Sequence, residues 1–516
     1  HEISSYQPRT SRDEMSDSLT NMCRREAAEW MISMNLYRLL EGLEWKGSVP
    51  DQDIPSLTCD SRQVQKGSVF VCIRGTLGDG HNYVAQALQK GAVFVVAQQD
   101  CKIPNQLLVE DTRRVYSQLC AAFFGYPARK MQLLALTGTN GKTTSAWMLH
   151  HALGHLGIKA GLIGTICNRI GESLTLPARY TTPDAWELQQ LLAMMFKQGC
   201  THVVMEASSQ AIEQQRLYGC QFSCAAFLNL TPEHLDIHGD VEHYFQSKAM
   251  LFEQCDRALL RIDDPYARRL LKDLQNKRMP LLTFGREQQA MLRAEQIQLF
   301  SDRCESTLCF QGERRQAKLP LPGEFSVENL MAAVGMLLQL GLPFAESVDA
   351  VCSCQGVPGR TEVCVSSGGI TVLRDYAHTP DSLRKVLRTI RKDCKGRLLV
   401  VFGCPGRRDR SKRPLMTQAV CENADLAVMT ADNPREEPLE QIFSDALADV
   451  RAGWQLRVIP DRAEAIHWAI SCCRRGDVLL LAGKGHENYQ VLADRTILFD
   501  EKQLVRQEFE RRKIES

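Results

Sequence analysis

The sequence lacks the features that mark a membrane protein, a nucleic-acid-binding protein or a secreted protein. No apolar run approaches the roughly 20 residues of a membrane-spanning helix, and no secretory leader pattern opens the chain. Lys plus Arg (62) nearly equals Asp plus Glu (61), so no excess charge of one sign attracts nucleic acid or anionic lipid. We therefore expect a cytoplasmic protein that binds neither a nucleic acid nor a membrane.

Metal-ligand spacing is also missing from the cysteines, although the chain has 20 of them. Cys352 and Cys354 are the nearest approach to a thiolate pair, and no second pair follows at the spacing of a zinc site. In a reducing compartment, scattered thiols are usually small buried hydrophobic groups. We assign none of them a role.

The chain of 516 residues is too long for one hydrophobic core, and about three domains are expected. Short β-branched runs alternate with longer helical patterns, which predicts an α/β fold with parallel sheets. Strands are expected at residues 68–73, 92–96, 132–136, 202–206, 398–402 and 478–481. Pro and Gly mark the junctions, so we expect a flexible extension over residues 1–33 and domains over 34–128, 129–357 and 358–516.

A glycine-rich loop lies between the strand expected at 132–136 and a helix expected to end near Gly154 or Gly157. In this context, backbone N–H groups and the helix N-terminus bind phosphate, and Lys142 would neutralise its charge. The first glycine stands only three residues before Gly141, which departs from the usual spacing of a phosphate loop. The sequence still predicts a nucleotide site, formed by Gly138, Thr139, Asn140, Gly141, Lys142, Thr143 and Thr144.

The apolar run 202–206 predicts a buried strand that ends in Glu206, at the sheet edge where ligands bind. Glu206 and the hydroxyl of Thr143 suit a Mg²⁺ ion that bridges ATP phosphates, whereas a surface carboxylate fits poorly after so apolar a strand. His234 and His238 are four residues apart, so a zinc pair on a helix is conceivable. No third ligand follows at a fitting spacing, and His238 could equally serve in a loop or cap.

With these motifs the sequence resembles the Mur ligase family of peptidoglycan synthesis, from about Met34 to the C-terminus. The resemblance implies an N-terminal α/β UDP-binding domain, a central P-loop ATPase-like parallel sheet and a C-terminal Rossmann-like domain. It also implies Mg²⁺ ligands at Thr143, Glu206 and His234, and N6-carboxylysine at Lys248 as a further ligand. Without it, Lys248 would be interpreted as a solvated helix lysine. The catalytic set that it implies is Lys142, Glu206, His234 and Lys248.

Other motifs match the family's nucleotide and substrate sites. The resemblance implies ATP contacts at Asn329, Arg360, Asp375 and His378. It implies muramoyl-substrate contacts at Ser61, Thr181, Thr182, Ser209 and Arg216.

The run Asp-Asn-Pro-Arg at 432–435 resembles the family's signature for meso-diaminopimelate, and the run at 483–487 resembles its companion. The implied residues are Asp432, Asn433, Pro434, Arg435, Gly483 and Glu487. Arg435 could fork onto the distal carboxylate that lysine lacks, while Glu487 could meet the neighbouring ammonium. A lysine substrate would leave Arg435 unpaired, which could give a ~10⁴-fold preference. The alternative for Arg435 is a residue that caps the turn after Pro434.

The resemblance thus implies a monomeric, ATP- and Mg²⁺-dependent amide ligase that adds meso-diaminopimelate to UDP-N-acetylmuramoyl-L-alanyl-D-glutamate through an acyl phosphate. Two alternatives stay open: the same ligase using L-lysine, and a non-catalytic paralogue that binds nucleotide or muramoyl peptide. Four residues depart from the family's pattern, namely Gln210, Glu233, Pro405 and Arg407. A folylpolyglutamate-type ligase would lack the uridine-like motifs at 59–62 and 79–82, and a switch GTPase would need an Asn-Lys-x-Asp motif that is absent.

Overall fold

The structure is a computed structural model that describes residues 33–41, 43, 49–75, 78–231 and 239–515. All but the last residue of the extension expected over 1–33 therefore lies outside the described residues. The described chain divides into two compact units. The first contains the described residues up to Lys130 together with 183–193 and 214–220, and the second contains the remainder.

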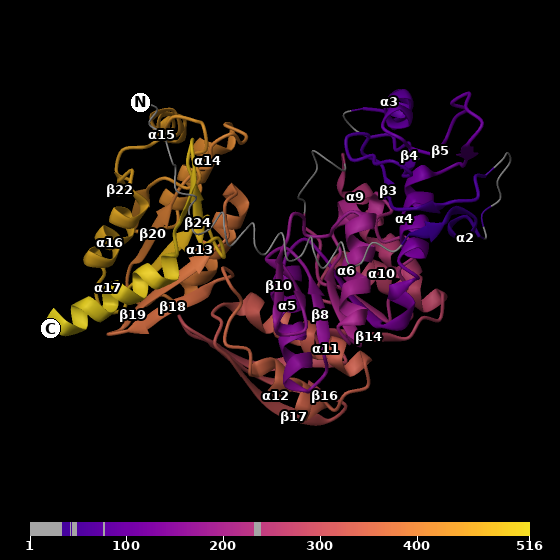
Figure 1. Cartoon of the computed structure of the whole chain (residues 1–516). Helices are drawn as coiled ribbons and strands as arrows, with labels where there is room; N and C mark the ends of the chain where they lie inside the picture. The colour runs from indigo at the N-terminus through magenta and orange to yellow at the C-terminus, as the bar shows by residue number, and fades with distance from the viewer. Residues whose placement is uncertain (1–32, 42, 44–48, 76–77, 232–238, 516) are drawn as a thin grey trace, which may run out of the picture. The chain divides into compact units, whose positions relative to one another are not determined.

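The first unit is built on a parallel sheet with the strand order β3-β4-β5-β6 (Figure 1). Its strands are β3 (Leu57–Thr58), β4 (Val69–Val71), β5 (Phe94–Ala97) and β6 (Gln106–Leu108). Alternate strand residues face two apolar clusters, one with α4 (Thr112–Phe123) and one with α3 (Val84–Gln89). Trp186 packs on Phe123 with ring centroids 4.9 Å apart, so residues 183–193 complete this core. The other elements are β1 (Met34–Asn35), α2 (Leu36–Leu39), β2 (Asp53–Ile54), η1 (Gly80–Tyr83) and η2 (Pro127–Lys130).

The second unit contains an 11-stranded sheet whose centre, β8-β11-β7-β12-β13-β14, is parallel. The central strands are β7 (Gln132–Thr137), β8 (Ala160–Ile163), β11 (His202–Glu206), β12 (Cys224–Phe227), β13 (Ala258–Arg261) and β14 (Leu281–Gly285). β15 (Leu292–Leu299) pairs parallel with β14. Antiparallel pairs then extend both edges, through β9 (Cys167–Ile170) and β10 (Leu174–Pro177) on one side and β16 (Cys304–Phe310) and β17 (Glu313–Leu319) on the other. Charged residues are frequent in β15 and β17, and this composition does not show that the two strands join the same sheet.

Helices cover both faces of this sheet. One face shares a core with α5 (Lys142–His155), α11 (Glu324–Gln339) and α12 (Phe344–Cys352). On the other face, Phe227 of β12 meets Phe245 and Phe252 at centroid distances of 6.3 and 6.5 Å. The helical elements of that half are α7 (Ser209–Glu213), α9 (Val241–Ala249), η3 (Met250–Gln254) and α10 (Pro265–Asn276). The helix α6 (Ala185–Lys197) begins in the first unit and ends in the second.

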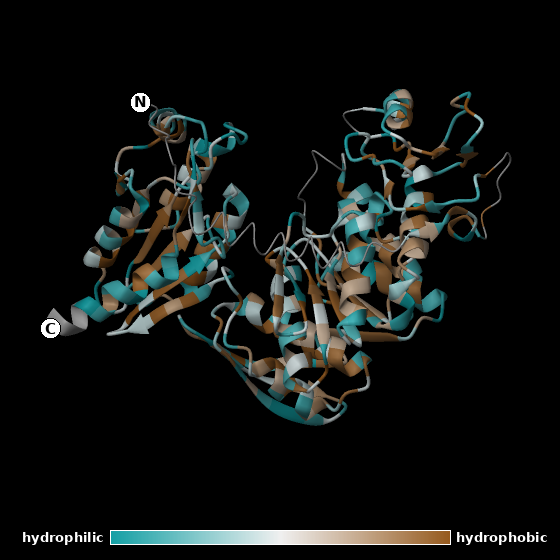
Figure 2. Ribbon diagram, in the orientation of Figure 1, coloured by the Kyte–Doolittle hydropathy of each residue, from teal (hydrophilic) through white to brown (hydrophobic). Residues whose placement is uncertain are grey.

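A separate six-stranded sheet, ordered β18-β19-β23-β20-β21-β22, forms the C-terminal part of the second unit. All its pairs are parallel except β18–β19, and the strands are β18 (Glu362–Ser367), β19 (Ile370–Asp375), β20 (Leu398–Phe402), β21 (Leu426–Met429), β22 (Leu456–Val458) and β23 (Val478–Ala482). One face packs on α13 (Pro380–Asp393), α14 (Lys412–Cys421) and α15 (Leu439–Leu447), the other on α16 (Arg462–Cys472) and α17 (Glu501–Glu515). A hairpin of β24 (Tyr489–Val491) and β25 (Thr496–Leu498) follows β23. The strands are hydrophobic and the outer helix faces are mixed (Figure 2).

The expected α/β fold with parallel sheets is confirmed, and a strand lies at each of the six expected places with bounds that differ by up to two residues. The expected domain boundaries are not tested by these observations and stay a prediction. Among the described residues, no helix combines the length and apolar character needed to cross a membrane.

A buried ion pair joins the first residues of α16 and α17 in the C-terminal part of the second unit. Arg462 and Glu501 are both fully buried, and Nε of Arg462 donates to Oε1 of Glu501 over 2.7 Å. Arg462 also donates to the carbonyl oxygens of Ala431 and Ala482, at 3.3 and 2.9 Å. These carbonyls directly precede the runs at 432–435 and 483–487, so one guanidinium fixes the starting points of both loops.

Replacing Arg462 with Met should lower the free energy of unfolding by about 3–5 kcal/mol, because Glu501 would stay buried without its cation. The double variant Arg462→Met/Glu501→Leu should recover much of that loss, since no uncompensated charge remains. Chemical denaturation of the whole chain measures both, with the exposed pair Arg391–Asp425 as the control: Arg391→Met should change stability by less than about 1 kcal/mol. Equal losses in the single and double variants would contradict this role of the pair.

Candidate active site

The loop at 138–144 follows β7 and begins α5, as the sequence predicts. Gly141 caps the helix with φ +87°, and a Cβ there would lie 2.4 Å from Oδ1 of Asn329. Glycine is therefore required both for the backbone angle and for the approach of Asn329. Lys142 folds over its own loop, because Nζ donates to the carbonyl oxygens of Gly138 (2.6 Å) and Thr139 (3.0 Å).

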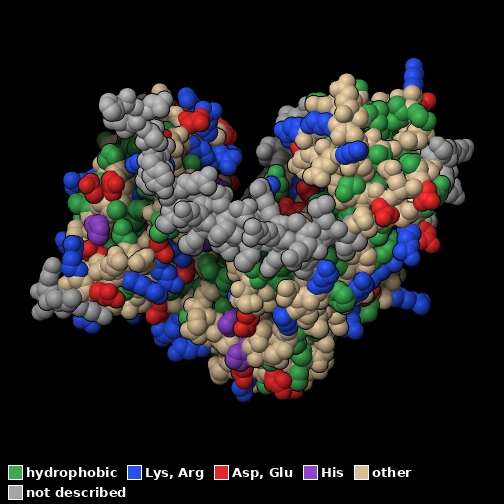
Figure 3. All heavy atoms as spheres, in the orientation of Figure 1, with side chains coloured by type: hydrophobic (Ala, Val, Ile, Leu, Met, Phe, Trp, Pro, Cys, Tyr) green, Lys and Arg blue, Asp and Glu red, His purple; other side chains and the backbone are tan. Residues whose placement is uncertain are grey.

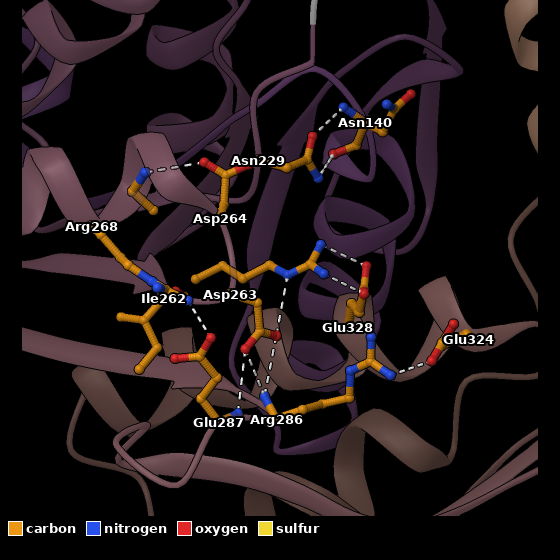
Figure 4. Close-up of polar contacts among 12 residues, drawn as sticks. Asn140, Asn229, Ile262, Asp263, Asp264, Arg268, Arg286, Glu287, Glu324 and Glu328 are labelled. Carbon is orange, nitrogen blue, oxygen red and sulfur yellow. Dashed lines mark hydrogen bonds and ion pairs between the residues drawn. The ribbon is translucent and has the colours of Figure 1, made fainter.

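The segment after β12 braces the loop. Oδ1 of Asn229 accepts from the backbone N–H of Asn140 (2.9 Å), and Nδ2 donates to its carbonyl oxygen (3.1 Å), as Figure 4 shows. The backbone N–H of Thr139 donates to the Asn229 carbonyl oxygen, and that of Leu230 to Oδ2 of Asp264 (3.0 Å). The side-chain amide of Asn229 thus anchors the phosphate loop to the end of β12 through a pair of hydrogen bonds.

A charged network lies beside these residues (Figure 4). Arg261, at the end of β13, forks onto Glu328, with Nη1 to Oε2 at 2.7 Å. Burial raises the pKa of Glu328, and the Arg261 guanidinium opposes that rise. Since Glu328 directly precedes Asn329, this pair fixes the part of α11 that contacts the phosphate loop.

Glu206 ends β11 next to Thr143. Its Oε2 accepts from the hydroxyls of Thr143 (2.8 Å) and Thr165 (3.0 Å), and Oε1 accepts from the backbone N–H of Thr165 (2.8 Å). Only 2% of Glu206 is exposed, so it is no surface carboxylate. One carboxylate with two hydroxyl groups is an all-oxygen set that fits Mg²⁺, which keeps several waters and phosphate oxygens.

The structure does not describe the expected metal ligand His234. His234, with Glu233 and His238, lies outside the described residues. In the described part of the chain, no group of three or more His, Cys, Asp or Glu side chains gathers as a metal site. Of the expected Mg²⁺ ligands, Thr143 and Glu206 are in direct contact, and the Mg²⁺ position stays a prediction.

Lys248 is buried on α9, with 1% of its surface exposed. Nζ donates to the carbonyl oxygen of Gly138 (3.1 Å) and lies 4.4 Å from the ring centroid of Tyr244. The alternative of a solvated helix lysine is wrong. The amine of Lys248 instead lies against the first glycine of the phosphate loop.

The residues expected at the muramoyl substrate fall into two groups. Thr181 contacts Thr165 (Oγ1 to Oγ1, 3.0 Å), Thr182 donates to the carbonyl oxygen of Glu206 (2.7 Å), and buried Ser209 begins α7. Ser61 and Arg216 belong to the first unit, where Ser61 donates to Gln86 (2.8 Å) and Arg216 donates to Gln214 (2.8 Å).

Thr165 is a site residue that sequence reasoning missed. It follows Gly164 after β8, and a Cβ on Gly164 would lie 2.4 Å from Oε1 of Glu206. A Gly-Thr pair directly after a strand of a parallel sheet was the available signal.

Near the same loop, Arg360 reaches Thr143, with Nη2 3.4 Å from Oγ1. Its guanidinium also lies 5.2 Å from the ring centroid of Tyr376. The carboxylate of Asp375 accepts from the backbone N–H of Thr361 (2.7 Å) and from the Thr361 hydroxyl (3.1 Å). These two hydrogen bonds hold Thr361, a non-glycine residue, at φ +42°. His378 contacts the carbonyl oxygen of Tyr376 through Nδ1 (2.7 Å).

The two runs that resemble amino-acid signatures meet in the C-terminal sheet. Nδ2 of Asn433 donates to Oε2 of Glu487 over 2.9 Å. Oδ2 of Asp432 is buried without a hydrogen-bond partner in the described part of the chain, beside Gly483, where a Cβ would lie 2.5 Å away. A buried acceptor of this kind suits a ligand's donor. Three residues after Gly483, burial lowers the pKa of His486 to about 4, which favours the neutral ring near pH 7.

Arg435 has φ +54°, and Nη1 donates to the carbonyl oxygen of Gly406 (2.7 Å). This contact joins two loops and supports the alternative of a turn-stabilising arginine. A Cβ on Gly406 would lie 1.9 Å from the carbonyl oxygen of Pro434, so the loops touch directly.

The departing residues Pro405 and Arg407 lie in this well-anchored loop. The backbone N–H of Arg407 donates to Oε2 of Glu437 (2.8 Å), and buried Arg413 forks onto the same carboxylate at 2.9 and 2.7 Å. These donors lower the pKa of Glu437 to about 2, with the Arg413 hydrogen bonds as the largest cause. Lys and Arg side chains gather on the surface over α14 (Figure 3).

Comparison with known proteins gives consistent results along the chain. Models described as "Mur ligase family, catalytic domain", "Mur ligase middle domain" and "Mur ligase, glutamate ligase domain" match residues 53–123, 136–337 and 359–485. One relative is the UDP-N-acetylmuramoyl-L-alanyl-D-glutamate–2,6-diaminopimelate ligase 1 of Clostridium acetobutylicum. It is 40% identical to this chain, and the match covers 88% of this chain and 94% of the relative. The corresponding ligase of Geobacillus thermodenitrificans is 40% identical over 92% and 99%.

A solved structure described as UDP-N-acetylmuramoyl-L-alanyl-D-glutamate–2,6-diaminopimelate ligase is also similar. It matches with a TM-score of 0.70 and 32% identity, and the match covers 93% of this chain and 99% of that chain.

Replacing Gly141 with Ala should weaken ATP binding by at least about 10-fold, because the added Cβ collides with Asn329 and the loop must open. Gly157→Ala is the matched control, since Gly157 also has positive φ (+76°) but a Cβ added there would meet no atom within 4 Å. Isothermal titration with ATP and Mg²⁺ compares the two. Similar affinities in both variants would show that the contact with Asn329 does not shape the loop.

Proposed function

The chain belongs to the Mur ligase family, and on that premise we propose that it adds meso-diaminopimelate to UDP-N-acetylmuramoyl-L-alanyl-D-glutamate. The family's ligase chemistry uses ATP. The observation that carries the proposed amino acid is the polar set of buried Asp432, buried Asn433 and half-buried Glu487, whose carboxylates offer acceptors to a ligand's ammonium. Relatives that are 40% identical over most of their length carry the same substrate in their names.

The proposed reaction has two steps. A carboxylate oxygen of the D-glutamyl residue attacks the γ-phosphorus of ATP, the bond to the β-phosphate oxygen breaks, and ADP leaves. The amine of the incoming amino acid then attacks the acyl carbon. Phosphate leaves as the C–O bond breaks, and the nitrogen gives up one proton as the amide forms.

The residues around the phosphate loop have distinct roles in this proposal. Backbone N–H groups of the loop and the N-terminus of α5 bind the phosphates, and Lys142 compensates charge on the transferring group. Mg²⁺ held by Thr143 and Glu206 would supply further charge neutralisation at the phosphates. Lys248, as N6-carboxylysine, would present an anion beside Gly138, and its burial there supports this role.

Two alternatives remain as outcomes of the test. L-Lysine as substrate gains support from the contact of Arg435 with Gly406, because that guanidinium already has a protein partner. A non-catalytic paralogue would rest on the departures at Gln210 and Pro405. A cytoplasmic location and a monomeric state stay predictions.

The purified protein should release phosphate and form a new amide when ATP, Mg²⁺ and UDP-N-acetylmuramoyl-L-alanyl-D-glutamate are supplied with meso-diaminopimelate. Product mass and phosphate release measure this, with L-lysine in a parallel reaction. A clear preference for diaminopimelate, up to ~10⁴-fold in kcat/KM, is expected if Arg435 pairs with the distal carboxylate. Equal use of lysine would keep the ligase and reject the specificity. No product with either amino acid, from protein that binds ATP, would favour the non-catalytic paralogue.

Lys248→Ala should reduce turnover by at least about 100-fold while ATP binding persists, because the missing anion acts at the phosphoryl-transfer step. Lys277→Ala, which removes an exposed lysine from the end of α10, is the control and should keep normal turnover. Added short-chain carboxylic acids should restore part of the activity of the Lys248 variant. Normal turnover of that variant without added acid would reject the carboxylysine.

A further inference from the structure

We propose that Lys484 is a positioning residue that sets amino-acid specificity, by holding one oxygen of Glu487 and leaving the other for the distal ammonium of the diamino acid. The inference rests on the proposed function and deepens it. It concerns a buried lysine in the loop after β23 to which the sequence assigns no role of its own.

Lys484 is fully buried, and its Nζ has two oxygen partners. It lies 3.1 Å from Oδ1 of Asn433 and 3.2 Å from Oε2 of Glu487. The ring centroid of Tyr489, on the following hairpin, is 5.7 Å away. The ammonium therefore lies at the junction of the two loops and the β24–β25 hairpin.

The ion pair of Lys484 with Glu487 is not explained by a gain in folding stability. A buried ion pair of a lysine and a carboxylate usually contributes no more than apolar residues of the same volume, because both charges lose their hydration. Glu487 is the only carboxylate within ion-pair distance of Lys484 in the described part of the chain. The lysine thus compensates this one acid, which is 15% exposed and is a proposed ligand of the substrate.

Lys484 also helps to hold the Asn433 amide in one orientation. Oδ1 of Asn433 accepts from Nζ of Lys484 and from the backbone N–H of Val491 (2.9 Å). Its Nδ2 must therefore face Oε2 of Glu487, at 2.9 Å. Without the ammonium, Val491 would still hold Oδ1 of Asn433, but Oε2 of Glu487 would keep only the Asn433 donor and would lose its ion-pair partner among the described residues.

As a consequence, the two carboxylate oxygens of Glu487 have different hydrogen-bond partners. Oε2 of Glu487 has two donors, Lys484 and Asn433, whereas Oε1 accepts no hydrogen bond from the described residues. Oε1 is the oxygen left for a ligand. Oδ2 of Asp432, buried and also without a partner in that part of the chain, is a second acceptor next to the same loop.

The test compares two amino acids that differ only at the distal amine: meso-diaminopimelate and L-2-aminopimelate, which keeps the distal carboxylate. The wild-type protein should prefer diaminopimelate by roughly 100-fold in kcat/KM, since the analogue leaves Glu487 unpaired. In Lys484→Met, this ratio should fall to within about 5-fold of unity, mainly through a higher KM for diaminopimelate, while the KM for ATP stays unchanged. Glu487→Gln should lose the ratio in the same way.

Lys395→Met, which removes an exposed lysine shortly before β20, is the control and should keep the wild-type ratio. Lys484→Gln, which keeps two donors but no charge, is interpreted in the same way if Lys484→Met does not fold. A Lys484 variant that loses activity equally with both amino acids would overturn the inference, because a merely structural lysine loosens the site for either. So would a wild-type protein that uses both equally well. A wild-type protein that makes no amide with diaminopimelate would instead reject the proposed function.

Discussion

The parallel pairing of β7 with β11 is the constraint on which the site depends. In this register Glu206 stands opposite Leu136, two residues before Gly138, where the phosphate loop begins. Both strands are buried on both faces, so a slip of one residue would turn Glu206 into the apolar core. The carboxylate and the Thr143 hydroxyl therefore meet because the sheet can form in only one register. The contacts of Thr165, Arg360 and Lys248 are all arranged around the position that this register defines.

Much of this arrangement could be predicted because it is local. A strand, a glycine-rich turn and a helix are adjacent in sequence, and a carboxylate at the end of an apolar run is visible without a structure. Lys248 is different, since nothing in its own helix shows that Tyr244 and Gly138 enclose it. Its role came only from the family resemblance. Thr165 and Lys484 were missed because their partners, Glu206 and Asn433, are 41 and 51 residues away.

Buried charge occurs repeatedly where loops must be held at fixed positions. Arg261 with Glu328, Arg413 with Glu437 and Arg462 with Glu501 each join segments that are distant in sequence. An apolar contact would stabilise such a junction without specifying its geometry, whereas a guanidinium fork accepts few orientations. The C-terminal sheet uses two of these pairs close to the amino-acid motifs. This explains how Pro405 and Arg407 can depart from the family's pattern while the loop keeps its anchors.

The reach of Arg462 to both Ala431 and Ala482 has a consequence for how this site could evolve or be redesigned. The loops at 432–435 and 483–487 share one anchor, and the β24–β25 hairpin bonds back to the first of them through Val491. If one loop were replaced with that of a relative that prefers another amino acid, the new loop would not fit the other loop and the hairpin that contact it. The unit that must be exchanged together consists of the two loops, the β24–β25 hairpin and Arg462. New substrate preferences in this fold should therefore arise by coordinated replacement more readily than by single changes.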